Sequence, residues 1–251
     1  MATPVPPWKV VWITGAGRGI GRQLALDLAR SGVKVAASAR TVADLTALAA
    51  EHPNITSFPL DVAKPDDVAA TVRAITGSLG PIDLAILNAG IWQPFDARAF
   101  EGEKSRQSME VNYFGITNAL DALIPDMVAR GAGHLALVAS VAGYRGLPKA
   151  AAYAPSKAAV IALAEVLRLE LERRNITVSL VNPGFVETPM TSVNEFPMPF
   201  IVSSETASRI ILGGLARRKY EVVFPWQMLV AMKVLRALPN ALFFRLAKRM
   251  L

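Results

Sequence analysis

The chain has 251 residues, 52% of them apolar, so its length suits one large α/β domain or two small ones with a substantial buried core. It contains no cysteine, which excludes disulfides, thiolate chemistry and cysteine-ligated zinc. The formal net charge of +7 is compatible with nucleic acid, an anionic membrane or phosphate-bearing ligands, but no basic run with interleaved aromatic residues occurs in the body of the chain, so we expect no nucleic-acid partner.

The first predicted strand follows a short, Pro-rich segment over residues 1–7. The apolar run 10–13 is too brief for the hydrophobic part of a signal peptide. No apolar stretch in the sequence reaches the roughly 18 residues that a membrane span needs. We therefore expect a cytoplasmic protein, and association with a membrane surface stays open only for the C-terminal segment.

Short apolar runs alternate with longer segments of helical periodicity, which is typical of βαβ units on a parallel sheet covered on both faces. The predicted strands are residues 9–13, 33–38, 55–59, 82–87, 134–139, 176–181 and 220–224. The predicted helices are residues 19–31, 41–50, 65–77, 104–130, 153–174 and 205–217, and we expect Pro125 to kink or end the fourth. No linker divides the chain, so the sequence predicts a single α/β domain over residues 1–251, with a Rossmann-like, doubly wound parallel sheet and helices on both faces.

Histidine gives no support for a metal site. The two histidines, His52 and His134, lie far apart and have no partners at the spacing of metal ligands, so we interpret both as surface or loop residues. Because cysteine is absent as well, we expect no bound metal ion.

A glycine-rich turn joins the first predicted strand to the first predicted helix. Its residues are Thr14, Gly15, Ala16, Gly17, Arg18, Gly19, Ile20 and Gly21. A turn of this kind at a helix N-terminus directs backbone N–H groups and the helix dipole at a pyrophosphate, and glycine permits the close approach. A plain structural turn is the alternative, but the position directly after the first strand favours an anion site.

The pattern Thr14-Gly15 followed by Gly19 and Gly21, TGxxxGxG, resembles the nucleotide-binding signature of the short-chain dehydrogenases/reductases. The resemblance covers roughly residues 8–190 and implies a Rossmann-like sheet of about seven strands. Two further matches resemble the family's adenine pocket and its NAG motif. They are the pair Asp61-Val62 after the third strand and the triplet Asn88-Ala89-Gly90 after the fourth.

Two arginines indicate which nicotinamide dinucleotide binds. A carboxylate at the end of the second strand would bind the ribose 2′-hydroxyl and repel a 2′-phosphate, but this strand ends Ala-Arg-Thr at residues 39–41. Arg40 is placed to bind a phosphate, and Arg18 in the glycine turn can hold its other side. Either arginine alone can be ordinary surface charge. Together, without an opposing acid, they predict NADP(H).

A second group of polar residues resembles the family's catalytic tetrad. Tyr153 and Lys157 are four residues apart and therefore share a helix face, Ser140 follows the fifth predicted strand, and Asn112 lies in the helix before that strand. A tyrosine and lysine at this spacing also occur on solvated helix faces. The company of Ser140 and Asn112 favours catalysis, because open α/β sheets bind ligands at the carboxyl ends of their strands.

The chemistry of carbonyl reduction suits these residue types. Hydride goes to carbon and a proton to oxygen, so Tyr153 can act as the acid, or as the base in the reverse reaction, if Lys157 and the positive nicotinamide ring lower its pKa from near 10. Ser140 can donate a hydrogen bond to the developing oxyanion. The resemblance implies that Lys157 also binds the nicotinamide ribose and that Asn112 positions a water for proton relay.

The loop after the sixth strand resembles the family's PG motif, whose backbone and threonine bind the carboxamide and the pyrophosphate. The matching positions are Pro183, Gly184, Val186 and Thr188. The segment 189–203 that follows is too long and Pro-rich for a simple turn, and we predict a substrate lid. Its apolar residues, with Trp92, Phe95, Tyr144 and Leu147, either line a pocket for a bulky hydrophobic ketone or simply pack the lid down.

The C-terminal segment 227–251 departs from the family, many of whose members end in an Asp-Gly-Gly-like sequence that supports a tetramer. Here two short apolar helices with basic residues are predicted over 228–237 and 241–250. A cap over the substrate pocket, a dimer surface and a membrane-surface anchor are the three interpretations. The long helices that begin near residues 104 and 153 can still form the homodimer common in the family.

The sequence thus predicts an NADPH-dependent carbonyl reductase or alcohol dehydrogenase that acts on a hydrophobic ketone or aldehyde. Within enzymes, the alternative is a 3-oxoacyl or other lipid-ketone reductase. Outside enzymes, it is a regulator that binds NADP without catalysis, and a membrane-surface protein whose C-terminal segment matters more than its site is a third hypothesis.

Overall fold

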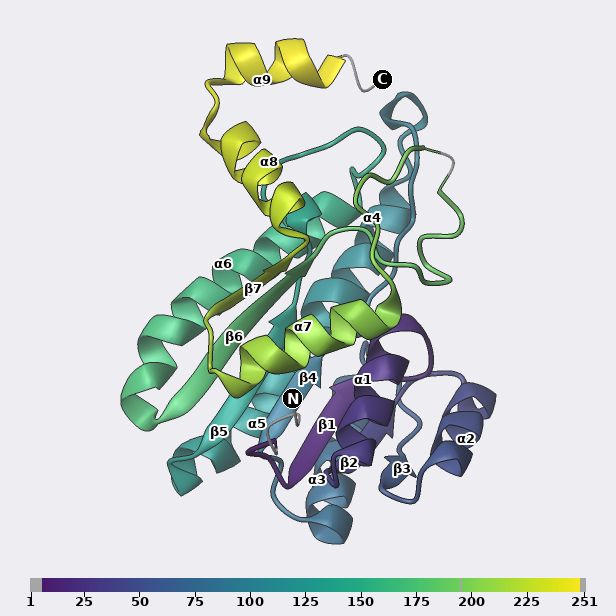
Figure 1. Ribbon diagram of the computed structural model, residues 1–251, viewed down its shortest axis with the longest axis vertical. Helices are drawn as coiled ribbons and strands as arrows, with labels where there is room; N and C mark the ends of the chain where they lie inside the picture. Colours follow the sequence, from purple (N-terminus) through teal and green to yellow (C-terminus); the bar gives the residue numbers. More distant parts are fainter. Residues whose placement is uncertain (1–5, 195, 249–251) are drawn as a thin grey trace.

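The computed structural model describes residues 6–194 and 196–248, whose seven strands form a parallel sheet in the order β3-β2-β1-β4-β5-β6-β7 (Figure 1). The strands are β1 (Val10–Thr14), β2 (Lys34–Ser38), β3 (Ile55–Ser57), β4 (Leu84–Leu87), β5 (Gly133–Val138), β6 (Ile176–Pro183) and β7 (Glu221–Phe224). The predicted doubly wound α/β fold is therefore confirmed.

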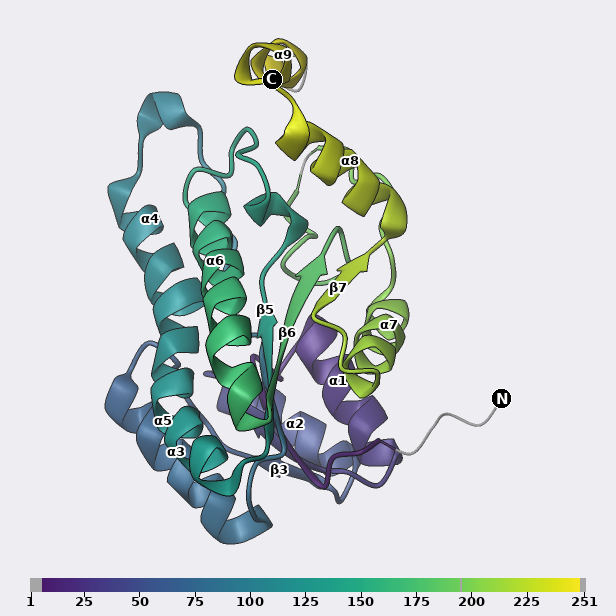
Figure 2. The ribbon, with the colours of Figure 1, turned by 90° about the vertical axis from the view of Figure 1, so that its left-hand side faces the viewer.

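Helices connect the strands as the periodicity predicted. They are α1 (Gly19–Arg30), α2 (Val42–Glu51), α3 (Pro65–Leu79), α4 (Gly102–Met109), α5 (Gly115–Arg130), α6 (Tyr153–Leu171), α7 (Ser204–Ala216), α8 (Trp226–Ala237) and α9 (Asn240–Ala247). Helices α3, α5 and α6 lie on one side of the sheet, and α1 and α7 lie on the other (Figure 2). The buried side chains of α3, α5 and α6 belong to one core cluster, and those of α1, α2 and α7 belong to the other. Successive side chains of β1 point to opposite faces of the sheet, so Trp12 packs in the core under α3, α5 and α6, and Ile13 packs in the core under α1, α2 and α7.

The long helix predicted over residues 104–130 differs from the prediction in one respect. Pro125 was expected to kink or end it, but the helix continues through Pro125 to Arg130, so the proline does not end it. Pro125 is exposed, and water can bond the Asp121 carbonyl that the proline nitrogen cannot reach. The helix is instead interrupted at Glu110–Phe114 by a π-helical turn, a feature that is frequent at functional sites, and this turn contains the buried Asn112.

His134 is another correction, because it is neither a surface nor a loop residue. It lies in β5, is 4% exposed, and its Nε2 is 2.9 Å from the Ser179 hydroxyl on β6. Burial lowers the pKa of His134 to about 4, and the Arg218 charge acts in the same direction. The histidine is thus a neutral core residue, with Trp8 packed against its ring at 5.9 Å between centroids.

The sheet order reverses between β1 and β4, because the chain winds outward to β3 and then returns to the other side of β1. Open α/β sheets bind ligands in the crevice that such a reversal opens at the carboxyl ends of the strands. Hydrogen bonds connect the two strand ends here. The Thr14 hydroxyl accepts from the backbone N–H groups of Asn88, at 3.0 Å, and Ala89, at 3.1 Å.

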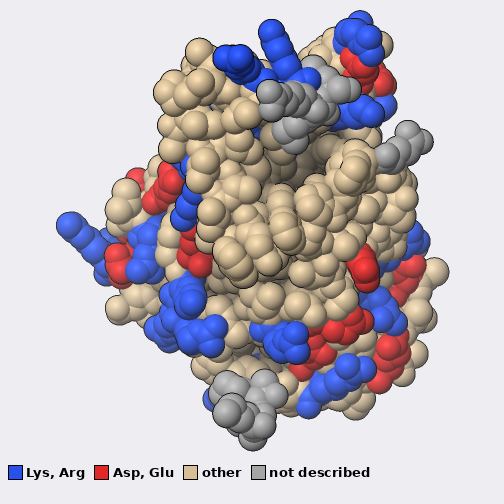
Figure 3. All heavy atoms as spheres, turned by 45° about the horizontal axis from the view of Figure 1, so that its top comes forward, with Lys and Arg blue, Asp and Glu red and all other residues tan. Residues whose placement is uncertain are grey.

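The last two helices extend past the sheet at the carboxyl end of β7 (Figures 1 and 2). Within residues 6–194 and 196–248, no helix has the length and apolar character that crossing a membrane requires. Figure 3 views the molecule from this end and shows a largely uncharged face with a hollow and with basic side chains at its upper rim.

Candidate active site

The glycine turn between β1 and α1 depends on its glycines. Gly15 and Gly19 have φ angles of +67° and +54°, in the left-handed region that side chains disfavour. A Cβ atom on Gly21 would lie 2.3 Å from the Gly15 carbonyl oxygen, so no larger residue fits there. Arg18 occupies the N-cap of α1 without a capping bond from its side chain, and the first N–H groups of the helix therefore have no side-chain cap. This geometry suits a pyrophosphate.

Part of the predicted cofactor set lines one pocket of about 250 Å³ at the carboxyl ends of β1, β2 and β4, whereas the predicted residues of the loop after β6 do not line it. Asn88 supports it, since its side-chain amide donates to the carbonyl oxygens of Thr14, at 3.1 Å, and Gly15, at 3.2 Å. The lining residues are Gly15, Gly17, Arg18, Ser38, Ala39, Arg40, Thr41, Asp44, Leu60, Asp61, Val62, Ala89, Gly90, Ile91 and Val111. The pocket fits a dinucleotide, because it combines the N-terminus of α1, the glycine turn and two flanking arginines.

An acid that the sequence analysis overlooked lies in the same pocket. Asp44, in the first turn of α2, accepts from the Arg18 guanidinium with 2.7 Å between Nε and Oδ2. The interpretation that the two arginines face no opposing acid is therefore wrong. Asp44 follows the end of β2 by six residues and lies on α2, so its position in the sequence does not mark it as a carboxylate at the strand end. The Arg40 side chain is exposed at the rim of the pocket.

The structure brings Asn112, Ser140, Tyr153 and Lys157 to the carboxyl side of β4 and β5. Tyr153 and Lys157 occupy the first turns of α6, and Lys157 Nζ is 5.6 Å from the centre of the Tyr153 ring. Buried Lys157 donates to the Val138 carbonyl at 2.9 Å. A Cβ atom on Gly90 would lie 3.2 Å from Asn112 Oδ1 and 3.4 Å from Lys157 Nζ, so both side chains converge on the cofactor loop.

Ser140 is the N-cap of the short 3-10 helix η3 (Val141–Gly143), which follows β5. Its hydroxyl accepts from the Ala142 N–H at 3.2 Å and donates to the Pro183 carbonyl at 3.4 Å. Ser140 therefore connects the end of β5 to the loop after β6.

The pKa of Tyr153 differs from the expectation. Burial raises it to about 12, and the Ser140 hydroxyl acts in the opposite direction. Burial also lowers the pKa of Lys157 to about 8, so this side chain still carries most of its positive charge at neutral pH. Burial therefore outweighs any lowering of the Tyr153 pKa by Lys157, and the predicted effect of the positive nicotinamide ring stays a prediction. Tyr153 is a protonated phenol at neutral pH.

Ser156 is a site residue that the sequence analysis missed. Its buried hydroxyl accepts from the Asn112 amide at 3.0 Å and donates to the Tyr153 carbonyl at 2.7 Å. The same Asn112 side chain accepts from the Ile91 N–H at 2.7 Å and donates to the Ile91 carbonyl at 3.1 Å. Asn112 thereby joins the loop after β4 to the start of α6. In the sequence, the only feature that could have pointed to Ser156 is its position between Tyr153 and Lys157.

The loop after β6 comes close to the glycine turn, as its predicted role requires. A Cβ atom on Gly19 would lie 2.9 Å from the Thr188 methyl group. Gly184 donates to the Phe224 carbonyl at 2.7 Å, which fixes the loop to β7. Val186 pairs with Val202 in an isolated parallel bridge, so the two ends of the segment 189–203 are held together.

The segment 189–203 reaches across to the loop after β4. Trp92 Nε1 donates to Asn194 Oδ1 at 2.9 Å, and the Trp92 ring packs edge-on against Tyr153 with 5.1 Å between centroids. Other predicted pocket residues are buried instead. Phe95 packs against Phe100, and the Tyr144 hydroxyl donates to Glu221 at 2.5 Å and accepts from Asn182 at 2.8 Å. For Tyr144, which is 7% exposed and hydrogen-bonded to Glu221 on β7, packing is thus the interpretation that its surroundings favour.

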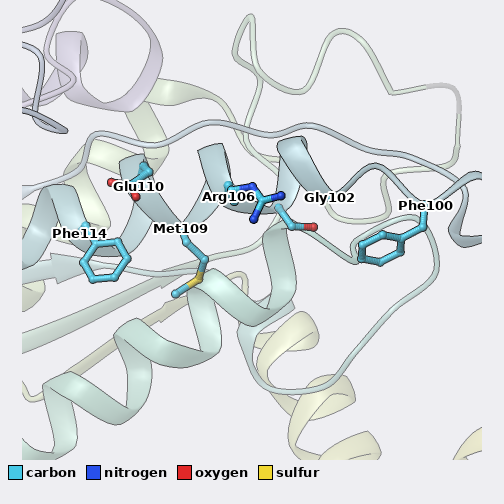
Figure 4. A pocket seen from close by; sticks show the side chains of 7 residues that line it. Phe100, Gly102, Arg106, Met109, Glu110 and Phe114 are labelled. Carbon is cyan, nitrogen blue, oxygen red and sulfur yellow. The ribbon is translucent and has the colours of Figure 1, made fainter.

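A second hollow, of about 370 Å³, lies along α4 and the π-helical turn (Figure 4). Its lining residues are Phe100, Gly102, Ser105, Arg106, Met109, Glu110 and Phe114. None of the predicted catalytic residues lines it.

Comparison with known proteins identifies the family. The family model described as short chain dehydrogenase matches residues 9–196. An uncharacterized oxidoreductase of Myxococcus xanthus is 39% identical over 247 residues, covering 97% of this chain and 98% of the relative. A dehydrogenase/reductase SDR family protein 7-like of Drosophila melanogaster is 33% identical over 264 residues, covering 97% and 81%.

Solved structures agree in fold. A short chain dehydrogenase/reductase of Burkholderia phymatum in complex with NAD has a TM-score of 0.84 and 23% identity, with 92% of this chain and 94% of that chain covered. An alcohol dehydrogenase of Thermococcus sibiricus complexed with 5-hydroxy-NADP has a TM-score of 0.78 and 25% identity, with 86% and 96% covered. The chain therefore belongs to the short-chain dehydrogenases/reductases, a family of oxidoreductases.

Proposed function

We propose that this oxidoreductase uses NADPH to reduce a hydrophobic ketone or aldehyde, and oxidises the corresponding alcohol in the reverse direction. The observation that carries the proposal is that Ser140, Tyr153 and Lys157 lie at the carboxyl ends of the strands, where open α/β folds bind ligands. Lys157 Nζ is 5.6 Å from the centre of the Tyr153 ring and lies beside Gly90, which lines the cofactor pocket. Asn112 connects this group to the loop that lines the cofactor pocket.

Each side chain has a distinct part in the reaction. Bound NADPH supplies the hydride. Tyr153, protonated because burial raises its pKa to about 12, gives its phenolic proton to the carbonyl oxygen. The Ser140 hydroxyl donates a hydrogen bond to that oxygen as negative charge develops. The Lys157 ammonium stabilises the phenolate left behind, and in the reverse direction the phenolate takes the proton from the alcohol.

Arg40 and Arg18 support the choice of NADPH. Arg40 is exposed at the rim of the pocket, where its guanidinium can pair with a 2′-phosphate. Arg18 can contribute as well, although its pairing with Asp44 competes with the phosphate. The two arginines at the rim of the pocket therefore attract the 2′-phosphate, and the Asp44 carboxylate weakens this attraction.

Exposed apolar side chains of the segment 189–203 support a hydrophobic substrate. They are Met190, Val193, Phe200 and Ile201, each between 36% and 62% exposed. We propose that this segment is a lid over the substrate. A 3-oxoacyl or other lipid-ketone reductase is the alternative that the same surface favours, and it predicts faster turnover as the alkyl chain of the ketone lengthens.

A homodimer is also proposed. Phe114, after α4, and Val166 and Leu169, on α6, are exposed on helices that belong to the same face of the sheet, and burying them against a second copy would remove apolar area from water. Light scattering of the purified protein tests this assembly.

The experiment that tests the function is NADPH oxidation, followed at the absorbance of the reduced nicotinamide, with ketones graded from small aliphatic to bulky aromatic and steroid-like. Tyr153→Phe should lose about 10²- to 10⁴-fold in kcat while still binding NADPH. Equal turnover by Tyr153→Phe would overturn the role of the phenol. Faster turnover with NADH would overturn the choice of cofactor, and NADPH binding without turnover of any substrate would favour the regulator.

A further inference from the structure

Helices α8 and α9 present apolar side chains that the other residues among 6–194 and 196–248 leave exposed. Trp226, Val230 and Val234 follow one another at four-residue spacing on α8 and so form a single stripe. On α9, Leu242, Phe244 and Leu246 are exposed around the one buried residue, Phe243. These six apolar side chains are between 45% and 68% exposed. Exposed apolar side chains that lie together in this way mark interaction surfaces more often than scattered ones do.

Basic residues accompany this stripe. The sequence has no acidic residue after Glu221, whereas Lys233, Arg236, Arg245 and Lys248 all lie beyond it. Glu221 pairs with Lys233 at 3.2 Å. Arg236, Arg245 and Lys248 are exposed, so the surface combines apolar and positively charged side chains.

The position of α9 is set by Arg145, from the loop that follows η3. Its guanidinium donates to Asn240 Oδ1 at 2.6 Å and stacks over the Phe243 ring at 4.2 Å. The two helices thus stand at the carboxyl edge of the sheet, the edge that also carries the catalytic residues (Figures 1 and 2). A flat partner that covers α8 and α9 would face the same end of the molecule as the active site.

We propose that α8 and α9 dock this protein on the surface of an anionic lipid bilayer. Amphipathic helices with basic residues beside apolar ones bind in the plane of such an interface, where the apolar side chains enter the acyl boundary and the cations pair with headgroups. A second copy of the chain fits less well. A two-fold contact would bring the same surface against itself, and its arginines and lysines would meet with no acid beyond Glu221 to offset them.

The test is flotation of the full chain with vesicles of phosphatidylcholine alone and with vesicles of equal parts phosphatidylcholine and phosphatidylglycerol. The wild-type protein should float with the anionic vesicles only. Arg245→Gln/Lys248→Gln should lower the partition coefficient about 30-fold at low salt, since each basic residue near an anionic surface contributes about a factor of five. Leu242→Ser/Phe244→Ser/Leu246→Ser should lower it roughly tenfold or more.

Arg173→Gln/Arg174→Gln is the matched control, because it removes two exposed positive charges from the turn before β6, at the opposite edge of the sheet. This control should float like the wild type. A wild-type protein that stays with the pellet, or a control that loses as much binding as the α9 variants, would overturn the proposal. So would α9 variants that change the elution volume in gel filtration, which would assign the surface to a second copy.

This proposal stands apart from the proposed reaction. Oxidation of NADPH with a small, water-soluble ketone should be unchanged in the α9 variants, since none of their substituted residues lies in the active site. Flotation therefore tests the bilayer contact whether or not a ketone substrate is found.

Discussion

The indole of Trp92 lies edge-on against the Tyr153 ring at an interplanar angle of 86°, and its N–H reaches across to Asn194. One side chain thus contacts the proposed acid and the proposed lid together. The edge-on contact holds the phenol in place, whereas the hydrogen bond holds the segment 189–203 over it.

We expect Trp92→Phe to separate these two contacts. Phenylalanine keeps an aromatic edge against Tyr153 but loses the N–H, so KM for a hydrophobic ketone should rise about fivefold, as one net hydrogen bond of about 1 kcal/mol predicts, with kcat nearly unchanged. Asn194→Ala should behave alike. Trp92→Leu removes the ring contact as well and should lower kcat. Steady-state kinetics decide, and a Trp92→Phe enzyme with reduced kcat and unaltered KM would contradict this division.

Ser156 should act as a positioning residue. In Ser156→Ala, the Asn112 amide loses a buried acceptor, which should cost roughly 1–3 kcal/mol in the free energy of unfolding. Because Ser156 also fixes the Tyr153 carbonyl, kcat should fall while KM for NADPH stays near its wild-type value. Urea unfolding and steady-state kinetics measure both effects. Ser78→Ala, which removes an exposed hydroxyl bonded within α3, is the control and should change neither quantity.

Asp44 should set the degree of cofactor preference. Asp44→Asn removes the charge that holds Arg18, so the affinity for NADPH relative to NADH should increase about tenfold at low salt. Arg40→Ala should shift the ratio in the opposite direction by a similar factor. Because Arg18 and Asp44 form an exposed pair, stability should change by less than about 1 kcal/mol. Titration of nicotinamide fluorescence gives both dissociation constants. If Asp44→Asn leaves the ratio of the NADPH and NADH affinities unchanged, Arg18 takes no part in binding the 2′-phosphate.

Much of the fold was predictable because its signals are local. Apolar runs of strand length and a glycine turn at the first helix depend on neighbouring residues only, and the seven predicted strands all occur. The four proposed catalytic residues could be named from the sequence because their types and spacing are local features, and their role stays a prediction.

Contacts between distant residues could not be predicted in the same way. The Tyr144 hydroxyl meets Glu221 across 77 positions, and Arg18 meets Asp44 across 26, so nothing in the local pattern marks either pair. The pKa of Tyr153 was mispredicted for a related reason. The charge of Lys157 can be inferred from the sequence, but burial is the larger effect on this pKa and depends on the whole packed site.

His134 should make stability depend on pH. Its pKa is lowered to about 4 in the folded protein, while in the unfolded chain it lies near 6.5, so between these values the unfolded state binds more protons. Stability is therefore fully retained above pH 6.5 and declines as the pH falls toward 4, where the loss approaches about 3 kcal/mol.

Carboxylates titrate in the same range, so the informative quantity is the difference between variants. His134→Gln should flatten the decline in urea-unfolding free energy between pH 6.5 and 4, whereas His52→Gln should retain the wild-type slope. The same slope in all three proteins would show that protonation of His134 is not coupled to unfolding.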